Sequence, residues 1–239
     1  MAQVSAKDLQ EKMVQYPSDG VTMHAYVAAP KTKGRRPAII VVQEWWGLNQ
    51  HMKDVAKRLA REGYVAIAPD MYSRLGHPVT TDSNEAGKLM NQLSMEDGLK
   101  DLNATVAYLQ AAPEVDPAHI GVTGFCRGGS YALMLPCVNP AIKAAVPFYG
   151  QVPNPDIPLK NLSAPVLYIY GEEDGWITKA DVQRLAQALK KYNKPGEIKT
   201  YPGAPHAFFN DTRKDVHKPT ESQDAWARAT AFFKQHLGA

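Results

Sequence analysis

The chain has 239 residues, of which 44% are hydrophobic and 21% are charged, and it contains only two cysteines. This balance is ordinary for a globular protein and excludes a disordered, a collagen-like or a disulfide-stabilised chain. Its 27 basic and 24 acidic residues are scattered and give a formal charge of +3, so the chain lacks the basic stripe of nucleic-acid-binding proteins and we expect no nucleic-acid partner.

The first segment of the chain does not have the pattern of a secretory signal. Residues 1–16 mix charges with isolated apolar positions and contain no apolar run followed by small residues. The best apolar runs elsewhere, residues 38–42 and 65–68, are far shorter than the roughly 18 residues that span a bilayer. We therefore expect a cytoplasmic protein with no membrane partner.

Short apolar runs alternate with longer amphipathic stretches along most of the chain. This alternation predicts an α/β fold, with a mostly parallel central sheet and helices on both faces. The expected strands are, in chain order, residues 21–29, 37–43, 64–69, 120–125, 144–149, 165–170 and 197–201. The expected helices are residues 50–62, 84–93, 95–111, a segment directly after Cys126, 179–192 and 221–237. Ser94 is placed to cap the third of these helices, and Asp97 lies near its positive end.

The length suits one domain. Domains have roughly 100–200 residues, and an α/β fold of this length forms a sizeable core without leaving room for a separate lid domain. Residues 151–163 are rich in proline and could be mistaken for a domain boundary, but so short a segment favours a surface crossover. We expect residues 1–239 to form a single domain.

The residues that follow each expected strand are the candidates for chemistry, because ligands meet a parallel sheet at the carboxyl ends of its strands. After the strand 120–125 comes Cys126, within the pattern G-x-C-x-G-G at residues 124–129. Flanking glycines permit the strained strand-to-helix turn of a nucleophile elbow, here with sulfur in place of oxygen. The helix that begins beside Cys126 favours the thiolate. The alternative is a small buried residue in a tight turn, and packing is the role expected for Cys137.

A nucleophile needs a base, and His206 is the strongest of the seven histidines. It lies in a loop stiffened by glycine and proline just past the strand 197–201. An acid that could orient it follows the strand 165–170, where Asp174 stands next to a glycine; Glu172 or Glu173 would fit the spacing equally well. The chain order of nucleophile, acid and base is that of the α/β-hydrolase triad.

A carboxylate and two large aromatic residues end the strand 37–43. Glu44 is followed by Trp45 and Trp46, and a buried acid without a basic partner is costly, so a solvated loop glutamate is the equal alternative at this stage. Other aromatic residues also lie on expected strand-end loops. Together they predict an aromatic pocket, with core packing as the alternative; they are Trp45, Trp46, Tyr149, Trp176, Phe208 and Phe209.

Five ordered segments of the chain resemble those of the dienelactone hydrolase family of α/β hydrolases. They are QEWWGLN at 43–49, PDMY at 69–72, GFCRGG at 124–129, GEED at 171–174 and HAF at 206–208. The resemblance runs from about residue 10 to the end of the chain. It implies an α/β-hydrolase fold and an esterase or lactonase activity.

The resemblance also implies a mechanism. Cys126 would rest as a neutral thiol near Glu44, and substrate binding would let Glu44 take the proton. His206 and Asp174 would stabilise the thiolate, which would attack an ester or lactone carbonyl and form an acyl-enzyme that water hydrolyses. No metal or cofactor is implied.

Further roles follow from the same resemblance and from the aromatic pattern. The backbone N–H groups of Trp45 and Arg127 would form the oxyanion hole. The side chains of Trp46, Tyr149 and Phe208 are the expected substrate-binding residues.

The chain departs from the family pattern where substrate is held. The dienelactone enzymes that it resembles bind a substrate carboxylate with two arginines, one in the segment that matches residues 82–93 and one shortly after the histidine. Here the segment has no arginine, and the second position is Asn210. Arg74, Arg127 or Arg213 could compensate or could form surface ion pairs. An uncharged ester or lactone is therefore as good a candidate as dienelactone.

Taken together, the residues predict a hydrolase that cleaves a small carboxylic ester or lactone through a Cys-His-Asp triad, as a monomer or weak homodimer. A broad-range carboxylesterase that does not act on dienelactone is the alternative enzyme. A non-catalytic ligand-binding protein or a thiol sensor is the alternative from another class. The acid–base residues argue against it, because a sensor needs no relay.

Overall fold

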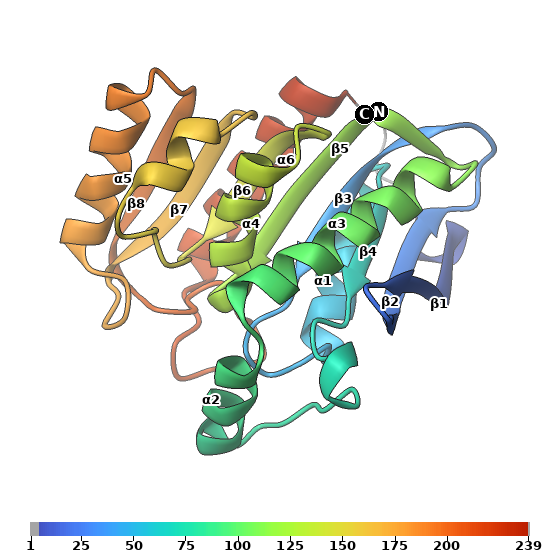
Figure 1. Cartoon of the computed structure of the whole chain (residues 1–239), viewed down its shortest axis with the longest axis horizontal. Coiled ribbons are helices and arrows are strands. Elements are labelled where there is room, and N and C mark those ends of the chain that lie inside the picture. The colour runs from blue at the N-terminus through green and yellow to red at the C-terminus, as the bar shows by residue number, and fades with distance from the viewer. Residues whose placement is uncertain (1–4, 239) are drawn as a thin grey trace.

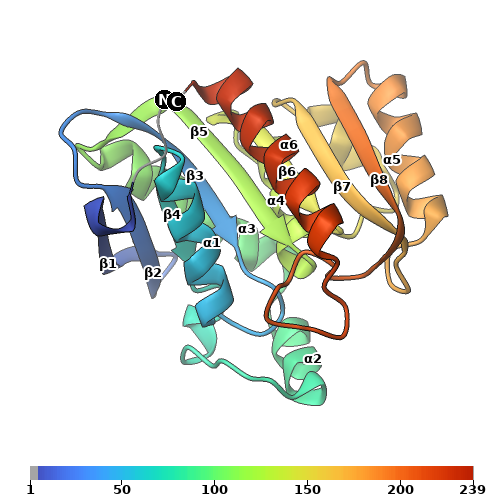
Figure 2. The same cartoon turned by 180° about the vertical axis from the view of Figure 1, so that it is seen from behind.

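The computed structural model describes residues 5–238, which form an eight-stranded sheet with helices on both faces (Figures 1 and 2). The spatial order is β1-β2-β4-β3-β5-β6-β7-β8. β1 and β2 join the sheet antiparallel, and the pairs from β4 to β8 are parallel. The strands are β1 (Leu9–Ser18), β2 (Val21–Pro30), β3 (Arg36–Val42), β4 (Val65–Pro69), β5 (Val115–Phe125), β6 (Ile142–Phe148), β7 (Val166–Glu173) and β8 (Gly196–Pro205).

The helices form two layers around the sheet. In chain order they are α1 (Gln50–Arg61), α2 (Ser83–Gln92), α3 (Met95–Ala111), α4 (Arg127–Val138), α5 (Lys179–Lys191) and α6 (Pro219–Leu237). α3, α4 and α5 pack on one face, whereas α1 and α6 cover the other (Figure 2). α2 projects beyond the carboxyl edge of the sheet (Figure 1). Three short 3-10 turns complete the structure: η1 (Ala6–Asp8), η2 (Ser73–Leu75) and η3 (Ile157–Asn161).

The predicted α/β fold is confirmed, and each expected strand and helix is present within a few residues of its bounds. Parallel strands covered on both faces are apolar almost throughout, so an apolar run in the sequence predicts them. The predicted cap is also present, since the Asp97 backbone N–H donates to the Ser94 hydroxyl over 3.0 Å.

β1 is the strand that the apolar pattern missed. It pairs with β2 along its whole length, but it lies at the edge of the sheet and most of its side chains are exposed. An edge strand tolerates charged residues on its open side, so its composition does not mark it as buried. Within residues 5–238, no helix combines the length and the apolar character needed to cross a membrane.

Candidate active site

Cys126 occupies a sharp turn between β5 and α4. Its φ of 56° and ψ of −119° lie outside the regions that L-residues usually adopt. The flanking glycines make this turn possible, because a Cβ on Gly124 would lie 2.1 Å from the Gly128 carbonyl oxygen. A Cβ on Gly128 would lie 2.2 Å from the carbonyl oxygen of Val42 on β3. The glycine pattern is therefore required by close backbone packing, as a nucleophile elbow requires.

The predicted acid and base meet at the carboxyl ends of β7 and β8. Nδ1 of His206 lies 2.7 Å from Oδ2 of Asp174. The backbone N–H groups of Trp176 and Ile177 donate to the other oxygen, Oδ1, over 2.7 and 2.8 Å. An ionised carboxylate can only accept a hydrogen bond, so in the neutral imidazole the proton lies on Nδ1 and Nε2 carries the lone pair. Nε2 is buried and has no hydrogen-bond partner among the described residues.

The structure also separates Asp174 from its two neighbouring acids. Glu172 forms a surface ion pair with Lys179, with 2.7 Å between Oε1 and Nζ. Glu173 is exposed. Asp174 is the acid that contacts His206, and its side chain is fully buried.

Glu44, directly after β3, is buried in the same site rather than solvated. Its residue is 2% exposed, and Oε2 accepts a hydrogen bond of 2.7 Å from Nδ2 of Asn210. Burial raises the pKa of the Glu44 carboxyl from 4.5 to about 7, although the Asn210 hydrogen bond, His206 and Arg213 oppose the rise. Glu44 therefore gains and loses its proton near neutral pH.

The thiol of Cys126 is protonated in this environment. Burial raises the pKa of this thiol far above the usual value, and the nearby Glu44 carboxylate is the second largest cause of the rise. The backbone N–H groups of Arg127 and Trp45 face the sulfur and oppose the rise. The backbone N–H groups at the start of α4 favour the thiolate, as expected, but desolvation outweighs them, so Cys126 rests as a neutral thiol.

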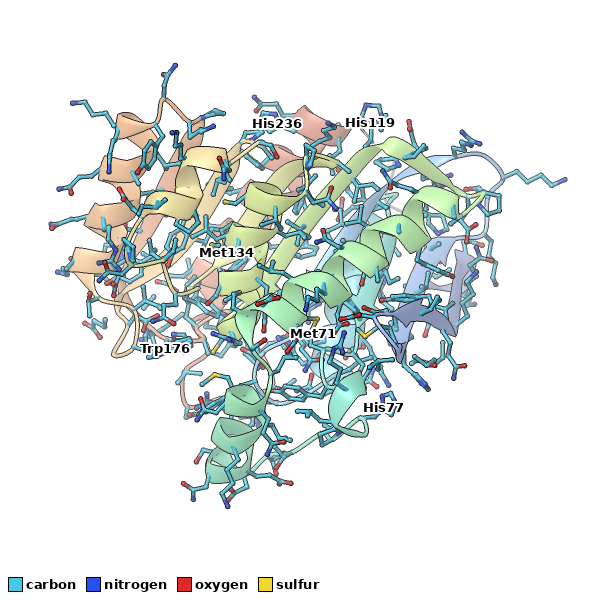
Figure 3. All side chains as sticks on the ribbon, in the orientation of Figure 1. Met71, His77, His119, Met134, Trp176 and His236 are labelled. Atoms are coloured by element: carbon cyan, nitrogen blue, oxygen red, sulfur yellow. The ribbon has the colours of Figure 1, made fainter. Side chains whose placement is uncertain are left out.

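A cavity of about 190 Å³ opens beside these groups. Three tryptophans, Trp45, Trp46 and Trp176, form much of its wall, and Trp176 lies at the carboxyl edge of the sheet (Figure 3). The full lining comprises Glu44, Trp45, Trp46, Met90, Cys126, Trp176, His206, Ala207 and Arg213.

Two of the expected substrate-binding residues lie behind the wall of this cavity. Tyr149 and Phe208 are both fully buried in the core, with ring centroids 5.7 Å apart. The Tyr149 ring packs edge-on against His206 at 5.0 Å, and Trp176 packs edge-on against the same imidazole at 5.2 Å. The aromatic set is therefore divided. The tryptophans line the cavity, whereas Tyr149, Phe208 and Phe209 pack in the core.

The three arginines considered as replacements have different surroundings. Arg74 makes two hydrogen bonds to the buried Asp101, and the pair lies outside the cavity lining. Arg127 lies over the ring of Tyr131 at 5.1 Å. Arg213 lines the cavity and pairs with Asp215 at 2.7 Å. Arg213 is thus the arginine that a ligand in the cavity meets.

Among the described residues, His206 is the histidine that lines the cavity, and the others lie outside its lining. His119 and His236 lie at the edge of the sheet opposite Trp176 (Figure 3). His77 pairs with Asp70 at 3.0 Å, and His51 is buried close to Asp211. Among residues 5–238, no group of three or more His, Cys, Asp or Glu side chains is arranged to hold a metal ion.

Three residues of the site were not predicted in the positions they occupy. Met90 reaches the cavity from α2, where an apolar residue on an amphipathic helix gives no signal of its own. Asn210 was noted as the residue at the position of a family arginine, but nothing in the sequence placed it against Glu44. Arg213 was one of three open candidates.

The chain is similar to known proteins over most of its length. The family model described as "Dienelactone hydrolase family" matches residues 23–237. "Protein usf" of Aquifex pyrophilus is 36% identical over 95% of this chain and 99% of its own. A "Putative carboxymethylenebutenolidase" of Synechocystis sp. is 38% identical over 96% of this chain and 98% of its own. A solved structure, a "Putative Dienelactone Hydrolase" from Klebsiella pneumoniae, is 36% identical with a TM-score of 0.90 and covers 95% of this chain and 99% of its own.

Proposed function

This chain belongs to the dienelactone hydrolase family of hydrolases, and from that premise we propose that it cleaves small carboxylic esters or lactones with Cys126 as the nucleophile. One observation carries the proposal. A cysteine in a strained elbow shares a single cavity with a buried carboxylate, Glu44, and with a histidine, His206, whose Nδ1 is engaged by Asp174. Neither a binding protein nor a thiol sensor needs this arrangement.

Activation of the thiol is the first step of the proposed reaction. The ionised Glu44 carboxylate accepts the proton of the Cys126 thiol, which leaves a thiolate and a neutral carboxylic acid. Two observations support this transfer: both groups line the cavity, and the pKa of Glu44 is raised to about 7. A base whose pKa lies near the working pH is the most effective one.

Acyl transfer follows. The sulfur attacks the carbonyl carbon, and the electron pair of the C=O bond moves to oxygen. The backbone N–H groups of Trp45 and Arg127 both contact the sulfur, which supports their role as donors to the oxyanion, an effect worth about 3 kcal/mol per donor. Collapse of the intermediate expels the alcohol, which takes the proton that Glu44 accepted from the thiol. Water then attacks the thioester, and Nε2 of His206 accepts one of its protons. The carboxylic acid is released as the C–S bond breaks, and the thiolate takes the proton from His206 to restore the resting thiol.

The cavity supports a small and mostly uncharged substrate. Its volume of about 190 Å³ and its tryptophan walls suit a compact acyl group or a lactone ring. A polar hollow of about 430 Å³ shares Trp46 and Arg213 with the cavity and gives room for a larger leaving group. Asn210 contributes no charge, and Arg213 already pairs with Asp215, so neither favours a substrate that carries a carboxylate. An ester without a carboxylate is therefore as good a candidate substrate as dienelactone.

A broad-range carboxylesterase is therefore the second candidate, and a substrate pair separates the two. We expect hydrolysis of both 4-nitrophenyl acetate and dienelactone. Activity on the aryl ester with only background rates on dienelactone would favour the carboxylesterase.

The role of Cys126 is tested with the second cysteine as control. Cys137 lies in the last turn of α4, where its thiol donates to the Leu133 carbonyl oxygen over 3.5 Å. We expect Cys126→Ala to abolish hydrolysis and Cys137→Ala to retain it. Unchanged ester turnover in Cys126→Ala would overturn the proposal.

A further inference from the structure

Asn210 contacts the group that the proposed reaction uses as a base, yet it lies outside the triad. Its residue is 1% exposed, and its side-chain N–H donates to Oε2 of Glu44 over 2.7 Å. A hydrogen bond from a neutral amide to a buried carboxylate stabilises the ionised form without adding a charge. Asn210 therefore acts on the ionisation of Glu44 directly.

Thr212 fixes which end of the amide faces Glu44. The backbone N–H and the hydroxyl of Thr212 both contact Oδ1 of Asn210, at 3.0 and 2.7 Å. A backbone N–H can only donate, so Oδ1 must be the acceptor on that side. The NH₂ group is thereby directed to Glu44, and a flipped amide would place two acceptors against each other.

The loop that carries Asn210 also carries the histidine of the triad. The backbone N–H of Asn210 donates to the carbonyl oxygen of Ala207 over 2.9 Å. The carbonyl oxygen of Asn210 in turn accepts from the N–H of Arg213 over 3.1 Å. These bonds hold residues 207–213 as a compact turn, so His206 and Asn210 approach the cavity from one short segment.

The other groups that act on Glu44 are few among the described residues. His206 and Arg213 favour its ionised form, whereas Cys126 and Tyr149 lie close enough for their own ionisation to be disfavoured by it. Arg213 is partly exposed and already paired with Asp215. The hydrogen bond of Asn210 is the largest of the influences that oppose the effect of burial on Glu44.

We propose that Asn210 is a positioning residue for the reaction, holding Glu44 beside Cys126 and stabilising its carboxylate, with Thr212 setting the direction of the amide. This inference rests on the proposed function, in which Glu44 accepts the thiol proton. Two uncharged side chains, those of Asn210 and Thr212, thus help to keep the buried base Glu44 ionised at neutral pH.

The test is the pH dependence of kcat/KM for 4-nitrophenyl acetate. Removing the donor in Asn210→Ala disfavours the carboxylate, so we expect the midpoint of the acid limb to move up by roughly one pH unit. Asn210→Asp removes the same donor and adds a like charge, and it is expected to shift the midpoint further in the same direction. At pH 6 the rate is then roughly tenfold or more below that of the wild-type enzyme.

Thr212 supplies a milder variant and a rescue. Thr212 is exposed, so Thr212→Val is expected to fold, and the loss of its hydroxyl donor is expected to shift the midpoint upward by less than Asn210→Ala does. Thr212→Ser restores the hydroxyl and the wild-type midpoint. Asn161→Asp, the same amide-to-acid change at an exposed position outside the cavity lining, controls for the added charge and leaves the midpoint in place.

Glu44→Gln distinguishes failure of this inference from failure of the proposed function. If Glu44→Gln keeps wild-type activity and pH dependence, the proposed role of Glu44 is wrong. If Glu44→Gln loses activity while the Asn210 and Thr212 variants keep the wild-type midpoint, Asn210 has only a structural role and the inference is overturned. A loss of activity in Asn210→Ala without a shifted midpoint has the same meaning.

Discussion

Two carboxylates flank the elbow of Cys126, and their surroundings are unlike. Asp174, after β7, accepts hydrogen bonds from two backbone N–H groups and from His206. Glu44, after β3, accepts one hydrogen bond, from Asn210, within the described part of the chain. A carboxylate held by three donors has a fixed orientation, whereas one with a single donor in a buried site is free to take a proton. The difference suits an orienting acid on one side of the sulfur and a base on the other.

The largest expected effect comes from Asp174→Asn. The N–H groups of Trp176 and Ile177 keep the amide oxygen on their side, so the NH₂ group faces Nδ1 of His206. The imidazole must then carry its proton on Nε2, the wrong tautomer for a base. We expect kcat to fall by about 10³–10⁴ at every pH, by analogy with the same change in a serine protease. A loss below tenfold in steady-state kinetics would remove Asp174 from its orienting role.

Glu44→Gln is expected to lower kcat/KM by about 10²–10⁴, the range for loss of a general base. Glutamine can still accept the hydrogen bond of Asn210, so the site keeps its shape while it loses the group that takes the proton. The rate that remains should no longer change with pH around neutrality. A circular dichroism spectrum equal to that of the wild type would show that the loss is chemical.

The wild-type enzyme should show the ionisation of Glu44 in its pH profile. Because the carboxylate form is the active one and its pKa is about 7, kcat/KM is expected to rise about tenfold per pH unit below 7 and to level off above it. Asp174→Asn should keep this limb at a lower rate, and Glu44→Gln should lose it. If Glu44→Gln keeps the acid limb of the pH profile, that limb reports the ionisation of another group. Glu44 would then not be the base that distinguishes it from Asp174.

The smallest expected effect is on stability. The folded protein holds the proton of Glu44 up to about pH 7, whereas the unfolded chain releases it near 4.5, so the free energy of unfolding falls as pH rises through this window. Above pH 7 the full cost of the buried charge remains, roughly 3 kcal/mol. Glu44→Gln should therefore be more stable than the wild type in urea at pH 8, with the gain vanishing below about pH 4.5. Equal stability at pH 8 would show that Glu44 is better solvated than its burial implies.

Much of the fold could be predicted because its elements have strong local signatures. The parallel strands are buried on both faces and read as apolar runs, and the capping Ser94 marked the start of α3. β1 was not predicted because an edge strand exposes most of its side chains. Its pairing with β2 depends on contacts that the local sequence does not encode.

The sequence by itself determined which residues are candidates for the proposed chemistry. Cys126 stands between glycines whose absent side chains permit close backbone contact, and His206 and Asp174 follow strands whose ends meet at one sheet edge. Such residues are marked by local backbone requirements and by topology, and both can be read along the chain.

Only the tertiary structure decided how these residues are surrounded. It buried Glu44, placed Asn210 against it and separated cavity-lining tryptophans from core residues such as Tyr149. It also supplied the reason why the Cys126 thiol stays protonated at rest, since desolvation by the assembled core exceeds the favourable effect of the backbone N–H groups. Burial and hydrogen bonding between distant segments set the pKa of a group, and neither can be read from the residues beside it in sequence.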